Sequence, residues 1–398
     1  MKLIKIGIRN NLFYPMMTII FTFSRSIISI ILDKKFNFNN QNILALIMFI
    51  SEFFSGAIFY QYQKAFLSII NKPNSETKSG KSVSIPSDAT HKYRKYILIL
   101  ACSLFDFLQF CLISYHFIKY DNISKSINYR LRSLLILCSA FFCYFLLKTQ
   151  IFKHQIFSLI IIFICFVSVC LIELYVIEDF RDLLKVLLLN VIRYIFSSIL
   201  EVTEKYLFEY ESLNPLFVLM IEGIFGIILT SIFLLTIENP FTHIKEKYDI
   251  NMHNIFLFII LLICYFIFSG GRNIYRLITN KIYSPMAKSL TDYFFVPLLI
   301  IFYFFIENDF QVKKQGKQSV PYFLLNILVS IITVFCSCIY NELFVLYCYR
   351  LEYNTYYEVS RRASSICEDK IKNNMELKQD DNITIEGGYY YNLENEKE

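Results

Sequence analysis

The chain has 398 residues, of which 56% are hydrophobic and only 18% are charged, and its formal net charge is +6. Soluble domains carry about a quarter charged residues, and the apolar residues of this chain are concentrated in blocks of about 20, the helix length that crosses a bilayer core. The composition excludes an ordinary soluble protein and predicts an integral, multi-pass membrane protein embedded in the lipid bilayer. Because the basic residues lie mainly between the apolar blocks, where they orient helices, the positive charge does not indicate nucleic-acid binding.

Ten of these blocks are long enough to be transmembrane helices. They cover about residues 13–32, 42–66, 95–117, 126–147, 154–175, 184–208, 214–236, 254–277, 285–306 and 321–347. The short basic segment before the first block is followed by no small-residue cleavage site, so we expect that block to be retained as a helix. The sequence thus predicts an all-α fold of ten transmembrane helices.

An even number of spans places both termini on one side of the membrane. With the termini in the cytoplasm, the cytoplasmic segments hold about twice as many lysines and arginines as the opposite loops, which is the usual bias. Two segments are too polar to form a packed core, and we expect both to be flexible and cytoplasmic. They are the loop at about residues 71–92 and the tail 351–398.

Ten spans divide into two repeats of five, residues 1–178 and 179–350. Because five is odd, the second repeat would be inserted upside down relative to the first, and inverted repeats of this kind place a binding site at the membrane midplane. Residues 124–132 open the fourth span much as residues 284–292 open the ninth, although two amphipathic helix starts can share such a similarity by chance. We therefore expect a 5+5 inverted repeat.

The ninth span carries polar residues at helical spacing. One stripe, at positions i, i+4, i+7 and i+8, is formed by Ser284, Lys288, Thr291 and Asp292. A charged side chain in the middle of the membrane costs at least about 2.5 kcal/mol when it faces lipid. The stripe predicts that this helix lines a solute pathway.

Ionisable residues occur deep in most of the other spans as well. Those inside the predicted spans are Arg25, Glu52, Asp106, Arg132, Arg193, Glu201, Glu204, Lys205, Glu222, Arg272, Lys288, Asp292 and Glu342. Acidic and basic members are nearly equal in number, which favours pairing between them. Most must face each other, the bundle interior or water, because the cost of facing lipid would rival the stability of the whole fold.

The sixth span carries the longest such stripe, made of Arg193, Ser197, Glu201 and Glu204, with Lys205 beside it. One interpretation is a ladder of ion pairs within the helix, because Glu201 and Lys205 are one turn apart. The other is that the stripe forms a second polar wall of the pathway. The spacing does not choose between them.

Three acids stand alone in apolar surroundings. Glu222 is followed by Gly223 and Gly226, which allow another helix to approach closely. It is therefore expected to act in helix packing or gating, or else to pair with a basic residue of another helix. Glu52 and Asp106 are likewise single acidic residues within apolar segments. Proton coupling through one of these three is a further hypothesis, because membrane-embedded carboxylates commonly form proton relays.

Signatures of catalysis or of a metal site are absent from the sequence. The five histidines lie mostly in loops or at span ends, without the paired spacing of a metal site. There is no nucleophile elbow and no phosphate-binding glycine loop. The eleven cysteines are scattered through the apolar blocks and are interpreted as reduced thiols. We expect neither enzymatic activity nor a metal or other cofactor.

Several short fragments follow one another on the expected spans. They are Phe49–Phe53, Phe105–Asp106 with Tyr115, Leu131–Ser133, Glu204–Lys205, Glu222–Gly226, Ser284 with Lys288 and Asp292, and Tyr340–Asn341. In these fragments the chain resembles the drug/metabolite transporter superfamily, and within it the solute carrier 35 family, nearest to its F-type members, over about residues 13–350. It departs from the family at Ser51, where glycine is common, and at Lys288, where arginine is usual. Lysine keeps the charge but lacks the planar fork that suits phosphate.

The resemblance implies a ten-helix, inverted-repeat carrier that moves a small-molecule substrate by alternating access. It also implies an internal membrane of a eukaryotic cell, in the Golgi, the endoplasmic reticulum or the endolysosomal system. Members of the family move nucleotide sugars, other phosphorylated metabolites or solutes not yet assigned. A homodimer is compatible with this interpretation.

Together these observations predict a secondary-active transporter of a polar or anionic small metabolite, with a cavity between spans 1–4 and 6–9. We expect Lys288 and Arg132 to face the cavity, with Asp292 beside Lys288. Further residues expected to line it are Asp106, Tyr115, Ser284 and Glu201. Residues expected to act in gating, coupling or helix packing are Glu52, Arg193, Glu204, Lys205, Glu222, Gly223 and Gly226. The alternative is a non-transporting scaffold or receptor whose tail recruits cytosolic partners, which an apolar seal between spans 4 and 9 would favour.

Overall fold

A computed structural model describes residues 4–6, 12–36, 38, 40–70, 89–119, 127–176, 180–236, 255–307, 319–347 and scattered positions between 351 and 362. Most of the expected loop at about 71–92 and most of the expected tail 351–398 lie outside the described residues.

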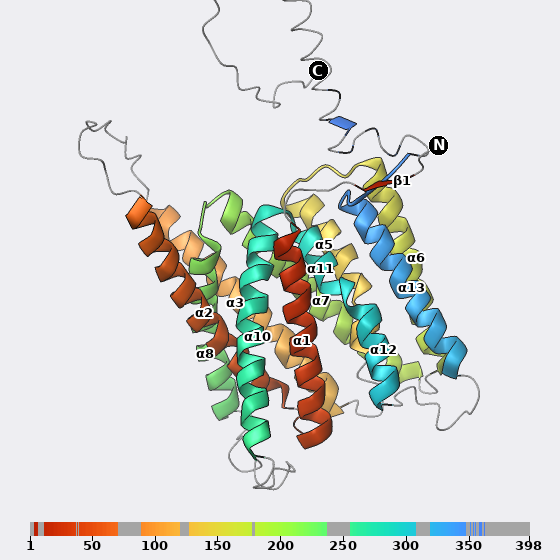
Figure 1. Cartoon of the computed structure of the whole chain (residues 1–398), viewed down its shortest axis with the longest axis horizontal. Helices are drawn as coiled ribbons and strands as arrows, with labels where there is room; N and C mark the ends of the chain where they lie inside the picture. The colour runs from red at the N-terminus through yellow and green to blue at the C-terminus, as the bar shows by residue number, and fades with distance from the viewer. Residues whose placement is uncertain are drawn as a thin grey trace, which may run out of the picture.

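Ten segments of the described chain are helical, long enough and apolar enough to cross a membrane. In chain order, spans 1 to 10 are α1 (Phe13–Phe36), α2 (Gln41–Ile70), α3 (Ala89–Lys119), α4 (Ile127–Arg130) with α5 (Ser133–Leu146), α6 (Lys153–Val176), α7 (Phe180–Glu209), α8 (Pro215–Thr236), α10 (Ile255–Ile282), α11 (Pro285–Phe294) with α12 (Val296–Glu307), and α13 (Ser319–Tyr340). The prediction of ten long apolar helices, compatible with a multi-pass membrane protein, is confirmed, although the fold also contains two short strands. The helices form one bundle with their axes roughly side by side (Figure 1).

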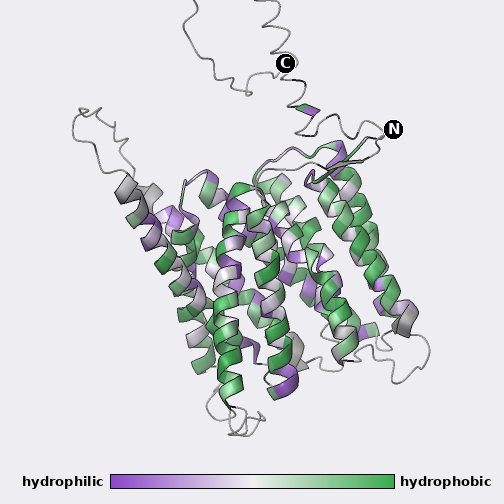
Figure 2. Ribbon diagram, viewed as in Figure 1, coloured by the Kyte–Doolittle hydropathy of each residue, from purple (hydrophilic) through white to green (hydrophobic). Residues whose placement is uncertain are grey.

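The outer surface of the bundle is apolar along most of its height. Large hydrophobic side chains such as Leu235, Phe256 and Phe305 are about three-quarters exposed. Hydrophobic residues follow the lengths of the helices, whereas hydrophilic residues gather at helix ends and between helices (Figure 2). An apolar girdle of this kind matches a lipid environment rather than water.

The closest helix contact joins α2 and α8, and glycines permit it. A Cβ atom added to Gly223 would lie 2.5 Å from the backbone nitrogen of Phe53, and one added to Gly56 would lie 2.8 Å from that of Met220. The two helices therefore pack backbone against backbone, each supplying a glycine to the other. Gly226 lies in the same contact, against the ring of Phe49.

Spans 4 and 9 are both interrupted within the membrane. In span 9 the break falls at Phe295, two residues before Pro297, because proline lacks an N–H and its ring clashes with the carbonyl of the preceding turn. In span 4 the break falls at Leu131 and Arg132, where the backbone tightens to hydrogen bonds between residues three apart. The guanidinium carbon of Arg132 lies 5.4 Å from the centre of the Phe295 ring, so the two breaks face each other.

Span 10 ends at Tyr340 and not at 347 as expected. Glu342 adopts the left-handed conformation with a φ of 60°, which turns the chain out of the helix. The chain then forms strand β2 (Phe344–Leu346), which pairs antiparallel with strand β1 (Ile4–Ile6). The beginning and the end of the described chain therefore lie at the same end of the bundle (Figure 1), as an even number of spans requires.

Candidate functional site

A charged cavity of about 160 Å³ lies inside the bundle. Its walls come from seven of the ten spans, namely spans 1, 2, 3, 4, 6, 8 and 9. The basic residues that line it are Arg25, Arg132, Arg193, Arg272 and Arg276, and the acidic ones are Asp33, Asp106, Glu201 and Asp292. Charges at this density inside a membrane protein mark a functional site by default.

The cavity extends toward the end of the bundle that is opposite to the termini. Its lining includes Asp33 near the last turn of α1, Gln41 at the first turn of α2 and Asn128 at the start of α4. All three helix ends belong to the face away from β1 and β2, because successive spans alternate in direction from the terminal face onward.

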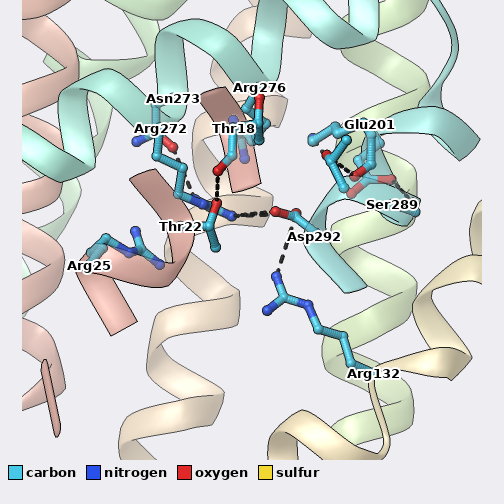
Figure 3. A network of polar contacts seen from close by, with 12 residues as sticks. Thr18, Thr22, Arg25, Arg132, Glu201, Arg272, Asn273, Arg276, Ser289 and Asp292 are labelled. Carbon is cyan, nitrogen blue, oxygen red and sulfur yellow. Dashed lines mark hydrogen bonds and ion pairs between the residues drawn. The ribbon is translucent and has the colours of Figure 1, made fainter. Parts of the chain in front are cut away.

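Asp292 is the central acid of the cavity. Its carboxylate lies 3.5 Å from a guanidinium nitrogen of Arg132 and 3.4 Å from one of Arg272 (Figure 3). These arginines reach it from the break of span 4 and from α10. One carboxylate is thus shared by two cations from two different spans, and it leaves them only partly neutralised.

Arg25 and Arg193 lie on α1 and α7, two other walls of the same cavity. Arg25 donates to the Met48 sulfur at 3.3 Å and lies 5.9 Å from the centre of the Tyr265 ring. Arg193 donates to Asn190 at 3.3 Å and lies 4.7 Å from the centre of the Tyr194 ring. In the part of the chain that the structure describes, neither guanidinium has a carboxylate partner.

Asp106 lines the cavity from α3. Within the described residues its carboxylate makes no ion pair or hydrogen bond. It is therefore a cavity acid whose carboxyl group is available to a solute.

A cluster of ion pairs, which shares Glu201 and Arg276 with the cavity wall, joins helices on the side of the cavity that leads to the terminal face. Glu204 accepts from Arg276 at 3.0 Å, from Asn280 at 2.9 Å and from Lys288 at 3.2 Å. Glu201 lies 3.6 Å from Lys288. The cluster joins α7, α10 and α11 near the ends that lead to the terminal face.

Lys288 does not line the cavity, although the polar stripe of the ninth span predicted that it would. Its side chain is 1% exposed and is absent from the cavity wall, because the two carboxylates of α7 hold it within the helix interface. Asp292 does line the cavity, but its ion pairs run to Arg132 and Arg272. The two charged residues of this stripe serve two different networks.

The two acids of the α7 stripe, Glu201 and Glu204, form their ion pairs with residues of other helices rather than along α7. Glu201 accepts hydrogen bonds from Ser139 on α5 at 2.9 Å and from Ser289 on α11 at 2.7 Å. Lys205 donates to the carbonyl oxygens of Lys281 and Tyr283, at 3.0 and 3.3 Å. A ladder confined to α7 does not describe these contacts, although Lys205 also pairs with Glu209 one turn away at 2.9 Å.

Glu52 and Glu222 lie at the contact of α2 and α8, away from the cavity wall. Glu52 accepts a hydrogen bond of 2.5 Å from Asn273. Glu222 is 4% exposed, and one of its carboxylate oxygens has no hydrogen-bond partner in the described structure. Neither acid touches the charged cavity directly.

Two further residues that were predicted to line the cavity lie outside it. Ser284 caps α11, because its side-chain oxygen accepts from the backbone N–H of Ala287 at 3.1 Å. Tyr115 is 44% exposed near the end of α3 and does not line the cavity. The structure thus assembles Arg132, Asp106, Glu201, Asp292 and Arg193 around the cavity, and these two lie outside it.

Sequence reasoning missed several cavity residues, most of them on α1 and α10. Arg25 and Arg272 were recognised as buried charges but not as site residues, and Arg276 was not singled out, because the eighth span was predicted to end at residue 277. Since α10 continues to Ile282, Arg276 is buried well inside the helix. The available signal was the i, i+4 spacing of Arg272 and Arg276, which puts both on one helix face.

Among the residues that the structure describes, no group of three or more His, Cys, Asp or Glu side chains could hold a metal ion.

Comparisons with known proteins identify no family. No family model matches the chain, and no curated protein matches it. One solved structure, described as "Crystal structure of protein", is 8% identical in sequence, covers 82% of this chain and 94% of its own, and superposes with a TM-score of 0.49. The function has to be argued from the charged cavity itself.

Proposed function

We propose that the chain is a secondary-active transporter that moves a polar or anionic small metabolite by alternating access. The observation that carries this proposal is the charged cavity, which lies inside a ten-span bundle, extends toward one end and is separated from the other end by an ion-pair cluster. Enclosing so many charges in the membrane is costly, and a solute pathway gives these charges a use. We further propose an architecture of the drug/metabolite transporter type.

The pattern of helix packing supports a 5+5 inverted repeat. If spans 1 to 5 are exchanged with spans 6 to 10, the contact of α1 with α10 becomes that of α7 with α3, and both are extensive. The contact of α3 with α8 becomes that of α10 with α2, and the contact of α5 with α7 becomes that of α11 with α1; all four occur. Spans 2 and 7 also share the pattern of an acid four residues before a glycine, Glu52 with Gly56 and Glu222 with Gly226.

One departure from this symmetry supports alternating access. Spans 6, 8 and 9 pack against one another at the ion-pair cluster through α7, α10 and α11. In the described chain the corresponding group, α1, α3 and the α4–α5 segment, makes at most marginal contacts of this kind. This asymmetry is expected of a carrier whose cavity is open between spans 1, 3 and 4 and closed between spans 6, 8 and 9. In the state open to the other side of the membrane, spans 1, 3 and 4 would be packed together and spans 6, 8 and 9 would be apart.

The contact of spans 4 and 9 bears on the alternative of a scaffold or receptor. An apolar seal would favour that alternative, but the contact includes the Arg132–Asp292 pair and a hydrogen bond of 2.9 Å between Ser139 and Ser289. Two interrupted spans that meet at a polar centre are typical of transporter binding sites. These contacts favour the transporter.

The substrate and its coupling are part of the proposal. A cavity of about 160 Å³ suits a small metabolite better than a nucleotide sugar. Of the three acids considered for proton coupling, Asp106 alone lines the cavity, so we propose it as the coupling candidate. We also propose an internal membrane with both termini in the cytoplasm.

Uptake into proteoliposomes tests the transporter proposal. Purified protein is reconstituted, and accumulation of labelled small carboxylates, phosphate and sugar phosphates is compared with that in protein-free vesicles. We expect saturable uptake of at least one solute, reduced at least about tenfold in Arg132→Gln. The matched control is Lys185→Gln, an exposed residue paired with Asp182 on the surface of α7. Equal uptake by wild type and Arg132→Gln would reject the charged cavity as the pathway.

A further inference from the structure

We infer that the charged cavity binds a doubly charged oxyanion, held between Arg25 on one wall and Arg193 on another. This inference deepens the proposed function by naming the chemical class of its solute. It rests on that function only in taking the bound anion to be the transported solute. Binding itself can be tested without transport.

Two arginines of the cavity, Arg25 and Arg193, have no carboxylate partner in the described structure, and a dianion would supply one negative charge for each. Arg276 and Lys288 are balanced by Glu201 and Glu204 in the ion-pair cluster. The remaining arginines in the central part of the cavity are Arg25, Arg132, Arg193 and Arg272. The carboxylates that line the cavity beside these four are Asp33, Asp106 and Asp292, and Asp292 is paired with Arg132 and Arg272. In the described structure none of the three forms an ion pair with Arg25 or Arg193.

An uncompensated cation inside a membrane protein is expensive, because the low-dielectric surroundings weaken its solvation and do not replace it. Arg25 and Arg193 each contact an aromatic ring, which orients a guanidinium group but leaves its charge in place. Their remaining N–H groups are available to a ligand. Both residues are thus held in position without being neutralised, which suits a binding site better than a structural ion pair.

The presence of arginine rather than lysine indicates the chemical class of the ligand. A guanidinium group is planar and presents its donors as a fork that matches a carboxylate or a phosphoryl group with two parallel hydrogen bonds. All of the basic residues that line the cavity are arginines. Two such forks in one cavity, on α1 and α7, fit either a dicarboxylate, with one carboxylate for each arginine, or a phosphoryl group shared by both. The common requirement is two negative charges on oxygen.

The orientation of the side chains agrees with this division of roles. Arg25 extends from α1 toward the space occupied by the guanidinium of Arg132 and by Asp292, whereas Arg272 is already directed at Asp292 (Figure 3). Arg25 and Arg193 are therefore the primary ligands in our proposal. Arg132 and Arg272 contribute their shared residual charge.

Binding to the purified full-length chain in detergent tests the inference. The anions are succinate, inorganic phosphate, acetate and chloride, compared at equal ionic strength by isothermal titration and by the shift in the unfolding temperature. We expect saturable binding of succinate, phosphate or both, since a ligand of the folded state raises the unfolding temperature in proportion to the logarithm of its concentration. Acetate and chloride should bind at least about tenfold more weakly. Succinate without phosphate would identify a dicarboxylate site, and phosphate without succinate a phosphoryl site.

Variants link the binding to the two arginines. Arg25→Gln and Arg193→Gln should each weaken binding of the dianion at least about tenfold. Arg94→Gln should leave it unchanged, because Arg94 is exposed on α3 and bonded to Tyr206 at 2.9 Å. If a glutamine variant fails to fold, Arg25→Lys and Arg193→Lys keep the charge and lose only the fork, and a smaller loss of affinity is expected from them.

The inference is overturned by equal binding of monoanions and dianions, by no binding of any anion, or by unchanged affinity in the arginine variants. These outcomes are separable from failure of the proposed function. Dianion binding without uptake in proteoliposomes would contradict transport and leave the site in place. Uptake of a neutral solute that dianions do not inhibit would leave transport in place and remove the site.

Discussion

Asp292 is the residue on which the electrostatics of the charged cavity depend most directly, because it faces two guanidinium groups at 3.4 and 3.5 Å. In Asp292→Asn the amide keeps the shape of the side chain, but both arginines lose their shared counter-ion. Removing one partner of a buried ion pair costs about 3–5 kcal/mol, so we expect a clear fall in the unfolding temperature of the ligand-free protein in detergent.

The control for this variant is Asp182→Asn. Asp182 pairs with Lys185 at 2.9 Å on the surface of α7, and such pairs contribute about 0–1 kcal/mol. Equal unfolding temperatures for the two variants would mean that solvent, and not Asp292, compensates the arginines.

Single residues also mark how far sequence reasoning reached. The spacing of the ninth span correctly identified a polar stripe, but it could not distinguish the two fates of Lys288 and Asp292. Helical periodicity shows on which face of its helix a side chain lies. The residue that it contacts depends on which other helix packs against that face. Arg25 was missed as a site residue because it is the one charged residue of the predicted span 13–32, and its contacts come from α2 and α10, which are distant in sequence.

At the scale of helices, the contact of α2 with α8 is so close that it leaves no space for a larger side chain at its glycines. In Gly223→Ala the new methyl group would meet the backbone of Phe53 at 2.5 Å, and in Gly56→Ala the backbone of Met220 at 2.8 Å. Because a backbone cannot rotate away, each variant must separate the helices. Overpacking of this kind costs about 1–3 kcal/mol, so both variants should lower the unfolding temperature.

Ile228→Ala on the same helix is the comparison, because Ile228 is 49% exposed on the lipid-facing side of α8. It should change the unfolding temperature much less than the two glycine variants. If Gly223→Ala were as stable as Ile228→Ala, the close approach of the two backbones would be refuted.

The helices themselves were the most predictable part of the fold. Each apolar block coincides with a helical span, because a chain in a bilayer must satisfy its backbone hydrogen bonds within the segment. The breaks within spans 4 and 9 were harder to predict from the sequence. Pro297 is a readable signal for the break in span 9, whereas span 4 breaks at Leu131 and Arg132 without proline or glycine. That break follows from tertiary contacts, which a single span does not encode.

At the scale of the whole molecule, the ion-pair cluster around Glu204 holds the terminal end of the bundle closed. In Glu204→Gln, Arg276 and Lys288 lose the charge that attracts both, and we expect the contacts of α7, α10 and α11 to open more often. Hydrogen–deuterium exchange should then increase in the last turns of α10, near residues 276–282, relative to wild type.

Glu209→Gln serves as the reference for that experiment. Glu209 lies on the same helix and pairs with Lys205, but its side chain is 50% exposed, so its loss should leave exchange in α10 unchanged. Identical exchange in Glu204→Gln and wild type would show that this cluster does not control opening at the terminal end.

The location of both chain ends at one face leads to a topological prediction. With tags fused to each terminus, protease added outside sealed microsomes should remove both tags, as expected if this face is cytoplasmic. Removal of neither tag would reverse the proposed orientation. Removal of one tag alone would contradict the even number of spans.

The short sheet that joins Ile4–Ile6 to Phe344–Leu346 has a consequence for biosynthesis. Strand β1 precedes all ten spans in the chain, and its partner β2 follows them. During translation β1 therefore has no β2 to pair with until the tenth helix has been made. The two strands can pair only on the same side of the membrane, so their pairing requires an even number of inserted spans between them. A chain that ends before residue 344 would leave the edge of β1 without this partner.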